Sequence, residues 1–304
     1  MDSAPPRMML PAMIEATGLT KRLGGRTVVS DVSFRCEPGT VTGFLGPNGA
    51  GKTTTLRMLV GLSAPDAGAS TVLERAYHDL ENPGLRVGVL LDAAAQHTGR
   101  SGREALTISA LMMGVDTARV GELLTLVGLD RSAARKRVRQ YSLGMRQRLG
   151  LAHALLGEPD VLILDEPANG LDPEGIRWMR GLLRNFADQG GTVLLSSHLL
   201  HEVEAIADKL LIIGNGRLVA DGARDELLAG TGVLVRATDE RALAAALEYA
   251  QLGFQRVDGG FVVDAGPEAV GRAALDGQVV LTHLGPSESA GLEQLFFDLT
   301  ETPA

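Results

Sequence analysis

The feature that most constrains the fold of this chain is a glycine-rich stretch between two apolar segments, Gly46-Pro47-Asn48-Gly49-Ala50-Gly51-Lys52-Thr53. It matches the pattern G-x-x-x-x-G-K-S/T, follows a predicted strand over residues 40–45, and opens into a predicted helix over residues 54–60. Glycines let backbone N–H groups turn toward a phosphate, and the helix N-terminus adds positive potential there. The stretch therefore predicts a phosphate-binding loop that extends to Thr54, with Lys52 on the β- and γ-phosphates and Thr53 on Mg²⁺.

Composition narrows the class of protein. The 304 residues allow about two domains at ~150 residues each. A hydrophobic fraction of 45% and a charged fraction of 22% are ordinary for a globular protein, and they exclude a disordered or fibrous chain. The net charge of −8 predicts no nucleic-acid partner. One basic run, Arg135-Lys136-Arg137-Val138-Arg139, is read as a solvated helix face, with a phosphate- or lipid-facing patch as the alternative.

Cysteine content and the apolar runs indicate a cellular location. The single cysteine, Cys36, can form no internal disulfide, which fits a reducing compartment. Residues 1–12 are expected to be a loose extension, because Pro11 interrupts a very short apolar run and no signal-peptide core develops. No stretch approaches the ~18 consecutive apolar residues of a transmembrane helix. If the protein works at a membrane, we expect another chain to span it.

The pattern of apolar residues predicts an α/β fold. Residues 14–38 alternate in short apolar pieces, which indicates a small antiparallel sheet at the N-terminus. Residues 102–129 show helical spacing, so we expect an all-helical insert over about residues 93–157. The runs at residues 161–164 and 192–195 are fully apolar, which is typical of parallel strands covered on both faces.

The C-terminal part predicts a second domain. A hairpin through Asn215-Gly216 closes the first domain, which we place at residues 13–229. Residues 230–304 then show a β-α-β-β-α-β succession, which predicts an accessory α+β domain, possibly ferredoxin-like. A terminal amphipathic helix is expected to follow, carrying Leu292, Leu295, Phe296 and Leu299.

Acidic and imidazole side chains follow two of the predicted parallel strands, where doubly wound sheets bind ligands. Asp165 ends an apolar strand, as a Walker B aspartate does to hold Mg²⁺ opposite Thr53. Glu166 comes next and is placed to polarise an attacking water. His198 lies just past the following strand and is expected to bond to the γ-phosphate.

A further stretch, Tyr141-Ser142-Leu143-Gly144-Met145-Arg146-Gln147-Arg148, resembles the signature motif of ATP-binding cassette (ABC) ATPases. Asn169-Gly170-Leu171-Asp172 resembles the D-loop of that family, and Ser197-His198 resembles its switch histidine. The motifs stand in the family's order, and the resemblance covers roughly residues 14–229. It implies a P-loop ATPase that binds ATP and Mg²⁺, with Lys52, Glu166 and His198 as catalytic residues.

The signature also has a physical reading. Ser142 can cap a helix that begins near Met145, which makes an anion site at a helix N-terminus. In the family, Ser142, Leu143, Gly144 and Met145 would meet the γ-phosphate held by another subunit, with Asp172 in the adjoining D-loop. The resemblance therefore implies a homodimer of ATPase domains that encloses two ATP molecules.

The sequence Ser-Leu-Gly-Met is similar to ATPase subunits of drug- and antibiotic-resistance exporters of the ABC-2 type, which also tend to carry a small C-terminal domain. That likeness implies ATP-driven export of a drug, antibiotic or lipid-like substrate through separate integral membrane permease subunits, at the cytoplasmic face of the cell membrane. Two alternatives stay open: a soluble ABC ATPase that acts on ribosomes or DNA, and an ABC importer ATPase. Soluble ABC ATPases that act on ribosomes usually carry a second cassette, and those that act on DNA carry long coiled-coil or zinc-binding inserts. This sequence has none of these features.

Two positions depart from the family pattern. Leu23 stands where the family usually has an aromatic residue that stacks on adenine, so weaker base recognition is expected. Asp92 stands where the family usually has the Q-loop glutamine, and it is expected to contact Mg²⁺ together with Thr53 and Asp165. Gln96 lies four residues on, so the register of this loop stays open between Asp92 and Gln96.

Overall fold

The computed structural model describes residues 13–198, 203–228 and 232–286. It forms two compact units, Met1–Asp221 and Gly222–Ala304. The predicted extension at residues 1–12 and the predicted terminal helix through Leu292 to Leu299 lie outside the described residues. The domain boundary predicted between residues 229 and 230 stays a prediction, because residues 229–231 are not described. No helix of the described part has the length and apolarity to cross a membrane.

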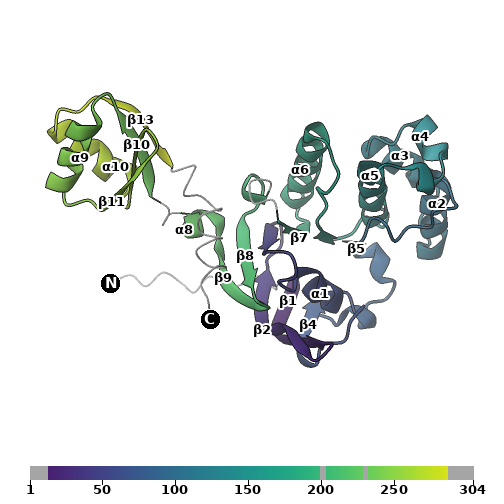
Figure 1. Ribbon diagram of the computed structural model, residues 1–304. Helices are drawn as coiled ribbons and strands as arrows, with labels where there is room; N and C mark the ends of the chain where they lie inside the picture. Colours follow the sequence, from purple (N-terminus) through teal and green to yellow (C-terminus); the bar gives the residue numbers. More distant parts are fainter. Residues whose placement is uncertain (1–12, 199–202, 229–231, 287–304) are drawn as a thin grey trace, which may run out of the picture. The chain divides into compact units, whose positions relative to one another are not determined.

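A six-stranded sheet in the order β5-β6-β7-β3-β8-β9 forms the centre of unit 1 (Figure 1). Its strands are β3 (Val41–Leu45), β5 (Val87–Leu90), β6 (Val161–Asp165), β7 (Thr192–Ser197), β8 (Lys209–Gly214) and β9 (Arg217–Ala223). The first five in spatial order pair in parallel. Every residue of β3, β6 and β7 is buried, as expected for parallel strands with both faces covered. Asn215 and Gly216, between β8 and β9, both have positive φ, as the tightest hairpin turns require.

The predicted N-terminal antiparallel sheet is present, in the order β2-β1-β4. Its strands are β1 (Ile14–Leu23), β2 (Arg26–Cys36) and β4 (Ala67–Val72). The sequence did not reveal β4, because its small side chains and glycine resemble a turn and only pairing with β1 holds it extended. Helix α1 (Lys52–Leu59) contacts both sheets, and its Leu56 and Leu59 share one core with Phe44 of β3 and Ile14 of β1.

The helical insert forms within the predicted residues 93–157. It contains α2 (Gly102–Met113), α3 (Ala118–Leu126), α4 (Arg131–Arg135), the 3₁₀ helix η3 (Val138–Gln140) and α5 (Leu143–Ala154). The sequence predicted that the basic run is a solvated helix face, and this prediction is wrong. Helix α4 ends at Arg135, and the chain then pairs with the loop before α2, where the Val138 N–H donates to Arg100 O at 2.8 Å. Helix α6 (Pro173–Asp188) packs on β3 and β7, and two further 3₁₀ helices are η1 (Tyr77–Asp79) and η2 (Pro83–Leu85).

Unit 2 has the predicted β-α-β-β-α-β succession after a short helix. Its elements are α8 (Arg224–Leu228), β10 (Val233–Ala237), α9 (Glu240–Tyr249), β11 (Phe254–Val257), β12 (Gly260–Val263), α10 (Pro267–Asp276) and β13 (Leu281–Pro286). The sheet order is β11-β12-β10-β13 with every pair antiparallel, which is the arrangement of a split βαβ motif. The last strand begins at Leu281 and not at Val279, because the Val279 N–H closes the end of α10 on Ala274 O at 2.8 Å.

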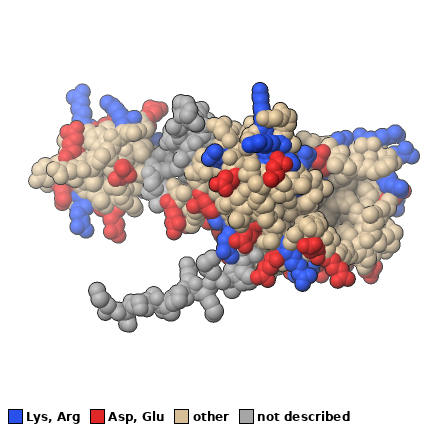
Figure 2. Space-filling model, turned by 90° about the horizontal axis from the view of Figure 1, so that it is seen from below, with Lys and Arg blue, Asp and Glu red and all other residues tan. Residues whose placement is uncertain are grey.

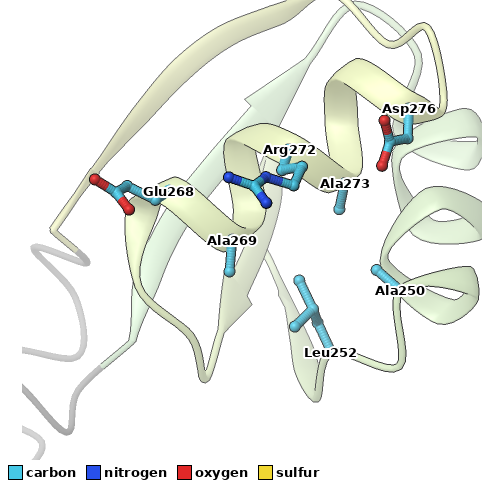
Figure 3. Close-up of a pocket in the computed structure, with 7 residues that line it drawn as sticks. All are labelled: Ala250, Leu252, Glu268, Ala269, Arg272, Ala273 and Asp276. Carbon is cyan, nitrogen blue, oxygen red and sulfur yellow. The ribbon is translucent and has the colours of Figure 1, made fainter.

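The architecture confirms the predicted fold class: an α/β domain with an N-terminal antiparallel sheet and a helical insert, and a small C-terminal α+β domain. Unit 2 also has a cavity of about 380 Å³ beside α10. Figure 3 shows Glu268, Arg272 and Asp276 spaced along that helix and Leu252 below it. None of the predicted site residues lies in unit 2, so the site is described in unit 1 alone.

Candidate nucleotide site

The phosphate loop joins β3 to α1, as predicted. Gly49 and Gly51 have φ of 84° and 107°, which residues with a side chain rarely adopt. A Cβ on Gly51 would also lie 2.6 Å from Val28 O, so this position accepts only glycine. Lys52 is buried and folds back over the loop, where its Nζ lies 2.6 Å from Gly46 O. A loop that turns successive backbone N–H groups inward at a helix N-terminus fits the polyphosphate of a nucleotide.

Asp165 links the loop helix to the neighbouring strands. The Thr53 hydroxyl donates to Asp165 Oδ2 at 2.6 Å, and the Ser196 hydroxyl donates to Asp165 Oδ1. These side chains meet because β7 lies between β3 and β6, and parallel strands end at the same edge of the sheet. A hydroxyl and a carboxylate are the oxygen donors that Mg²⁺ prefers, so Thr53 and Asp165 fit such an ion.

Glu166 contacts the other two predicted catalytic residues, His198 and Lys52. Its Oε2 is 2.7 Å from Nδ1 of His198, and its Oε1 is 3.6 Å from Nζ of Lys52. Glu166 has a φ of 48°, a left-handed conformation that is uncommon for a residue other than glycine. Its N–H donates to both the carbonyl and the hydroxyl of Ser196, at 3.2 Å and 3.0 Å, and these bonds help to hold that conformation.

The sequence did not predict the contacts of two further residues of the site: Gln147, which was identified only as part of the signature stretch, and Ser196. Gln147 of α5 is 5% exposed, and its Nε2 donates to Glu166 O at 3.1 Å. Its Oε1 is buried without a hydrogen-bond partner among the described residues. Ser196 bonds to both Asp165 and Glu166, as described above. Each contact joins segments far apart in sequence, so only the strand order and the packing of α5 reveal it.

The signature residues begin α5, as predicted. Ser142 is the N-cap, and its hydroxyl accepts from the Met145 N–H at 3.2 Å. A Cβ on Gly144 would lie 2.6 Å from Gly170 O, so the signature packs closely on the turn before the D-loop aspartate. Asp172 caps α6 and accepts from the Gly175 N–H at 2.9 Å. The hydrogen bonds and ion pairs of the described residues do not join the signature to the phosphate loop of this chain.

Among the described residues, the hydrogen bonds of Asp92 and Gln96 in the loop after β5 do not involve Asp165 or Glu166. Asp92 is exposed, and its Oδ1 accepts from the Ala94 N–H at 2.7 Å. Gln96 Nε2 contacts Arg146 O in α5 at 3.4 Å. Across the described residues, no group of three or more His, Cys, Asp and Glu gathers in a metal-binding arrangement. The role of Asp92 therefore stays a prediction. Leu23 ends β1 and is 51% exposed.

Comparisons with known proteins agree with this geometry. A family model described as ABC transporter matches residues 29–169. A bacitracin transport ATP-binding protein of Bacillus licheniformis is 39% identical over 72% of this chain and 72% of its own length. A Nod factor export ATP-binding protein I of Burkholderia lata is 36% identical over 95% of this chain and 97% of its own length.

A solved structure of an ATP-binding subunit of an ABC transporter is also similar to this chain. It superposes with a TM-score of 0.64 at 28% identity, covering 71% of this chain and 91% of that one. The sequence relatives and the superposed structure point to one family. The geometry of the phosphate loop, of Asp165 and of the signature agrees with it. The chain belongs to the ABC transporter family and is an ATP-binding cassette ATPase.

Proposed function

We propose that this chain is the ATP-binding and ATP-hydrolysing subunit of an exporter, and that it works as a homodimer with separate integral membrane permease subunits at the cytoplasmic face of the cell membrane. The observation that carries hydrolysis is the contact of Glu166 with Lys52 and His198 beside Asp165. Export is supported by the relatives named for bacitracin transport and Nod factor export. The substrate class is a drug, an antibiotic or a lipid-like molecule.

In this mechanism the loop residues 46–54 bind the phosphates of ATP, and Thr53 and Asp165 would hold Mg²⁺. Bound Mg²⁺ neutralises charge on the phosphates. Glu166 accepts a proton from the attacking water, and its carboxylate is oriented by His198 at 2.7 Å. Lys52 stabilises the negative charge that develops on the γ-phosphate.

The signature completes the site from the second copy. Ser142 and the N–H groups in the first turn of α5 would form an anion site, but no hydrogen bond among the described residues joins Ser142 to the phosphate loop of its own chain. An ATP bound to one copy would therefore meet the signature of the other. Closure of the dimer on ATP, followed by hydrolysis and reopening, would drive the permease subunits.

The variant Glu166→Gln tests hydrolysis and the dimer together. We expect it to bind ATP normally and to lose nearly all turnover, because the amide keeps the size of the side chain but cannot act as a base. With Mg²⁺ and ATP it should elute as a dimer in size-exclusion chromatography. Glu122→Gln, at an exposed position on α3, is the matched control and should behave as the wild type. A Glu166→Gln protein that binds ATP and stays monomeric at micromolar concentration would refute the dimer model.

The permease partner is tested separately. The chain should co-purify in detergent with a membrane protein of about six hydrophobic segments, and that partner should stimulate its ATPase activity. Stable association with ribosomes or DNA in place of such a partner would favour the soluble-ATPase alternative.

A further inference from the structure

Arg148 of the signature helix α5 links that helix to both α3 and α6. Most arginines of the helical insert are exposed, and Figure 2 shows Lys and Arg side chains projecting from the insert at the right of the view. Arg148 is half-buried instead, and the ATPase mechanism does not use it. In Figure 1, α5 lies between α3 and α6, and the Arg148 side chain contacts both of these helices.

The first contact of Arg148 is with the end of α3. Its Nη1 donates to Val127 O at 2.9 Å, and Val127 is the C-cap residue of α3. The last carbonyls of a helix have no partner within the helix and carry partial negative charge, so a guanidinium group is a suitable donor there. Gly128 follows with a φ of 70°, and a Cβ at this position would lie 2.8 Å from Arg148 Nη1. The glycine therefore leaves room for the guanidinium group at the end of α3.

The second contact of Arg148 is with Trp178 on α6. Its Cζ lies 4.7 Å from the centroid of the Trp178 ring, which is a cation–π contact. A Cβ on Gly175 would lie 3.1 Å from Arg148 Nη2 and 2.7 Å from Asp172 Oδ1, so the guanidinium group lies close to the capped first turn of α6. One planar group thus donates to α3 and stacks on α6 at the same time, which the ammonium group of a lysine could not do.

The signature helix also contacts the D-loop at its start. A Cβ on Gly144 would lie 2.6 Å from Gly170 O, so the two backbones are in close contact there. Arg148 lies about one helical turn, ~6 Å, further along α5. A helix held at one point is free to pivot, whereas two contacts one turn apart fix the direction of its axis.

We propose that Arg148 is a positioning residue that sets the orientation of the signature helix α5 against the D-loop helix α6. It thereby fixes the spacing at which Ser142 and Asp172 are presented to the second copy. Helix α6 packs on β3 and β7, so the central sheet supplies the fixed frame for this contact. The proposal rests on the proposed homodimer, because the signature and Asp172 would both act on the second copy.

Variants on both sides of the stack test the proposal in the full chain with Glu166→Gln as the parent. By analytical ultracentrifugation with Mg²⁺ and ATP, Arg148→Ala and Trp178→Leu should each raise the dissociation constant of the dimer on the order of tenfold, the effect of losing one partly buried cation–π contact. The affinity for ADP should stay the same, because the phosphate loop of one copy is not touched. Trp178→Phe keeps a ring face and should dimerise nearly as the parent does. Arg177→Ala, at an exposed position of α6, is the matched control and should dimerise as the parent.

Tryptophan emission tests the contact itself. Trp178 is the only tryptophan of the chain, so all tryptophan emission comes from this ring. Arg148→Ala uncovers one face of the ring and should make the emission more accessible to quenching by acrylamide. The control Arg177→Ala should leave the quenching unchanged.

The double variant Arg148→Ala, Trp178→Leu should dimerise like Arg148→Ala alone, because the ring acts through the guanidinium group. Effects that multiply, normal dimerisation of both folded single variants, or quenching that Arg148→Ala leaves unchanged would each overturn the role of Arg148. Urea denaturation identifies a variant that does not fold, and Trp178→Leu decides the outcome if Arg148→Ala is such a variant. A Glu166→Gln parent that stays monomeric with ATP would overturn the proposed dimer as well, whereas a parent and variants that dimerise equally would overturn the role of Arg148 alone.

Discussion

Gln147 offers a sharp test of how the signature helix is coupled to the catalytic glutamate. Its Nε2 donates to Glu166 O at 3.1 Å from a side chain that is 5% exposed. The variant Gln147→Met keeps the length and volume of the side chain but removes the donor. A buried hydrogen bond contributes ~1 kcal/mol net, and a left-handed backbone such as that of Glu166 costs roughly 1–3 kcal/mol to maintain. Loss of the bond therefore shifts Glu166 out of its catalytic conformation for much of the time.

The expected result is a change in kcat with little change in KM for ATP. Since about 1.4 kcal/mol corresponds to a factor of ten in rate, a loss of ~1 kcal/mol should lower kcat about fivefold. KM should stay the same because Lys52 and the loop are not touched. The unfolding free energy should change by ~1 kcal/mol or less, since the variant also removes the buried Oε1 of Gln147, which has no described partner.

Steady-state ATPase assays and urea denaturation measure these quantities. Gln255→Met, at an exposed position of β11 in unit 2, is the control and should leave both constants unchanged. An unaltered kcat in a folded Gln147→Met protein would refute the role of Gln147 in positioning Glu166. A raised KM with normal kcat would refute it as well, because it would place Gln147 in nucleotide binding.

Three further predictions concern other parts of unit 1. Because Leu23 supplies no ring and stacking contributes about 1–3 kcal/mol, the measured preference for ATP over GTP should stay below about a hundredfold; a larger value would mean that another residue reads the base. Across a Mg²⁺ titration, Asp92→Ala should weaken the Mg²⁺ dependence of ATPase activity and Gln96→Ala should change it little, while the reverse ranking would put the loop register at Gln96. Burial lowers the pKa of His153 from 6.5 to about 4, so the unfolded chain binds the proton first as the pH falls. Stability should therefore drop by roughly 3 kcal/mol at most between pH 6.5 and 4, and His153→Leu should remove this component of the pH dependence measured by denaturation.

Local sequence determined the elements and much of the candidate site. Some conformations depend only on neighbours a few residues away in the chain. Examples are the glycines at left-handed positions, Ser142 and Asp172 before helices, and the apolar run that ends in Asp165. Their conformations are therefore legible in one stretch of chain. For this reason the loop, the Ser142 cap and the parallel strands were predicted at nearly the bounds that the structure shows, whereas the cap that Asp172 forms on α6 was not predicted.

Tertiary structure alone decided which of these elements meet. Strand β4 exists because β1 pairs with it, and its own side chains give no strand pattern. The basic run leaves α4 because its backbone bonds to the loop before α2, which overrides the helical tendency of the run. Gln147 and Ser196 hold Glu166 because α5 and β7 come to it from segments far away in sequence. Hydrogen bonds between distant segments depend on strand order and helix packing, and a pattern of neighbouring residues does not encode those directly.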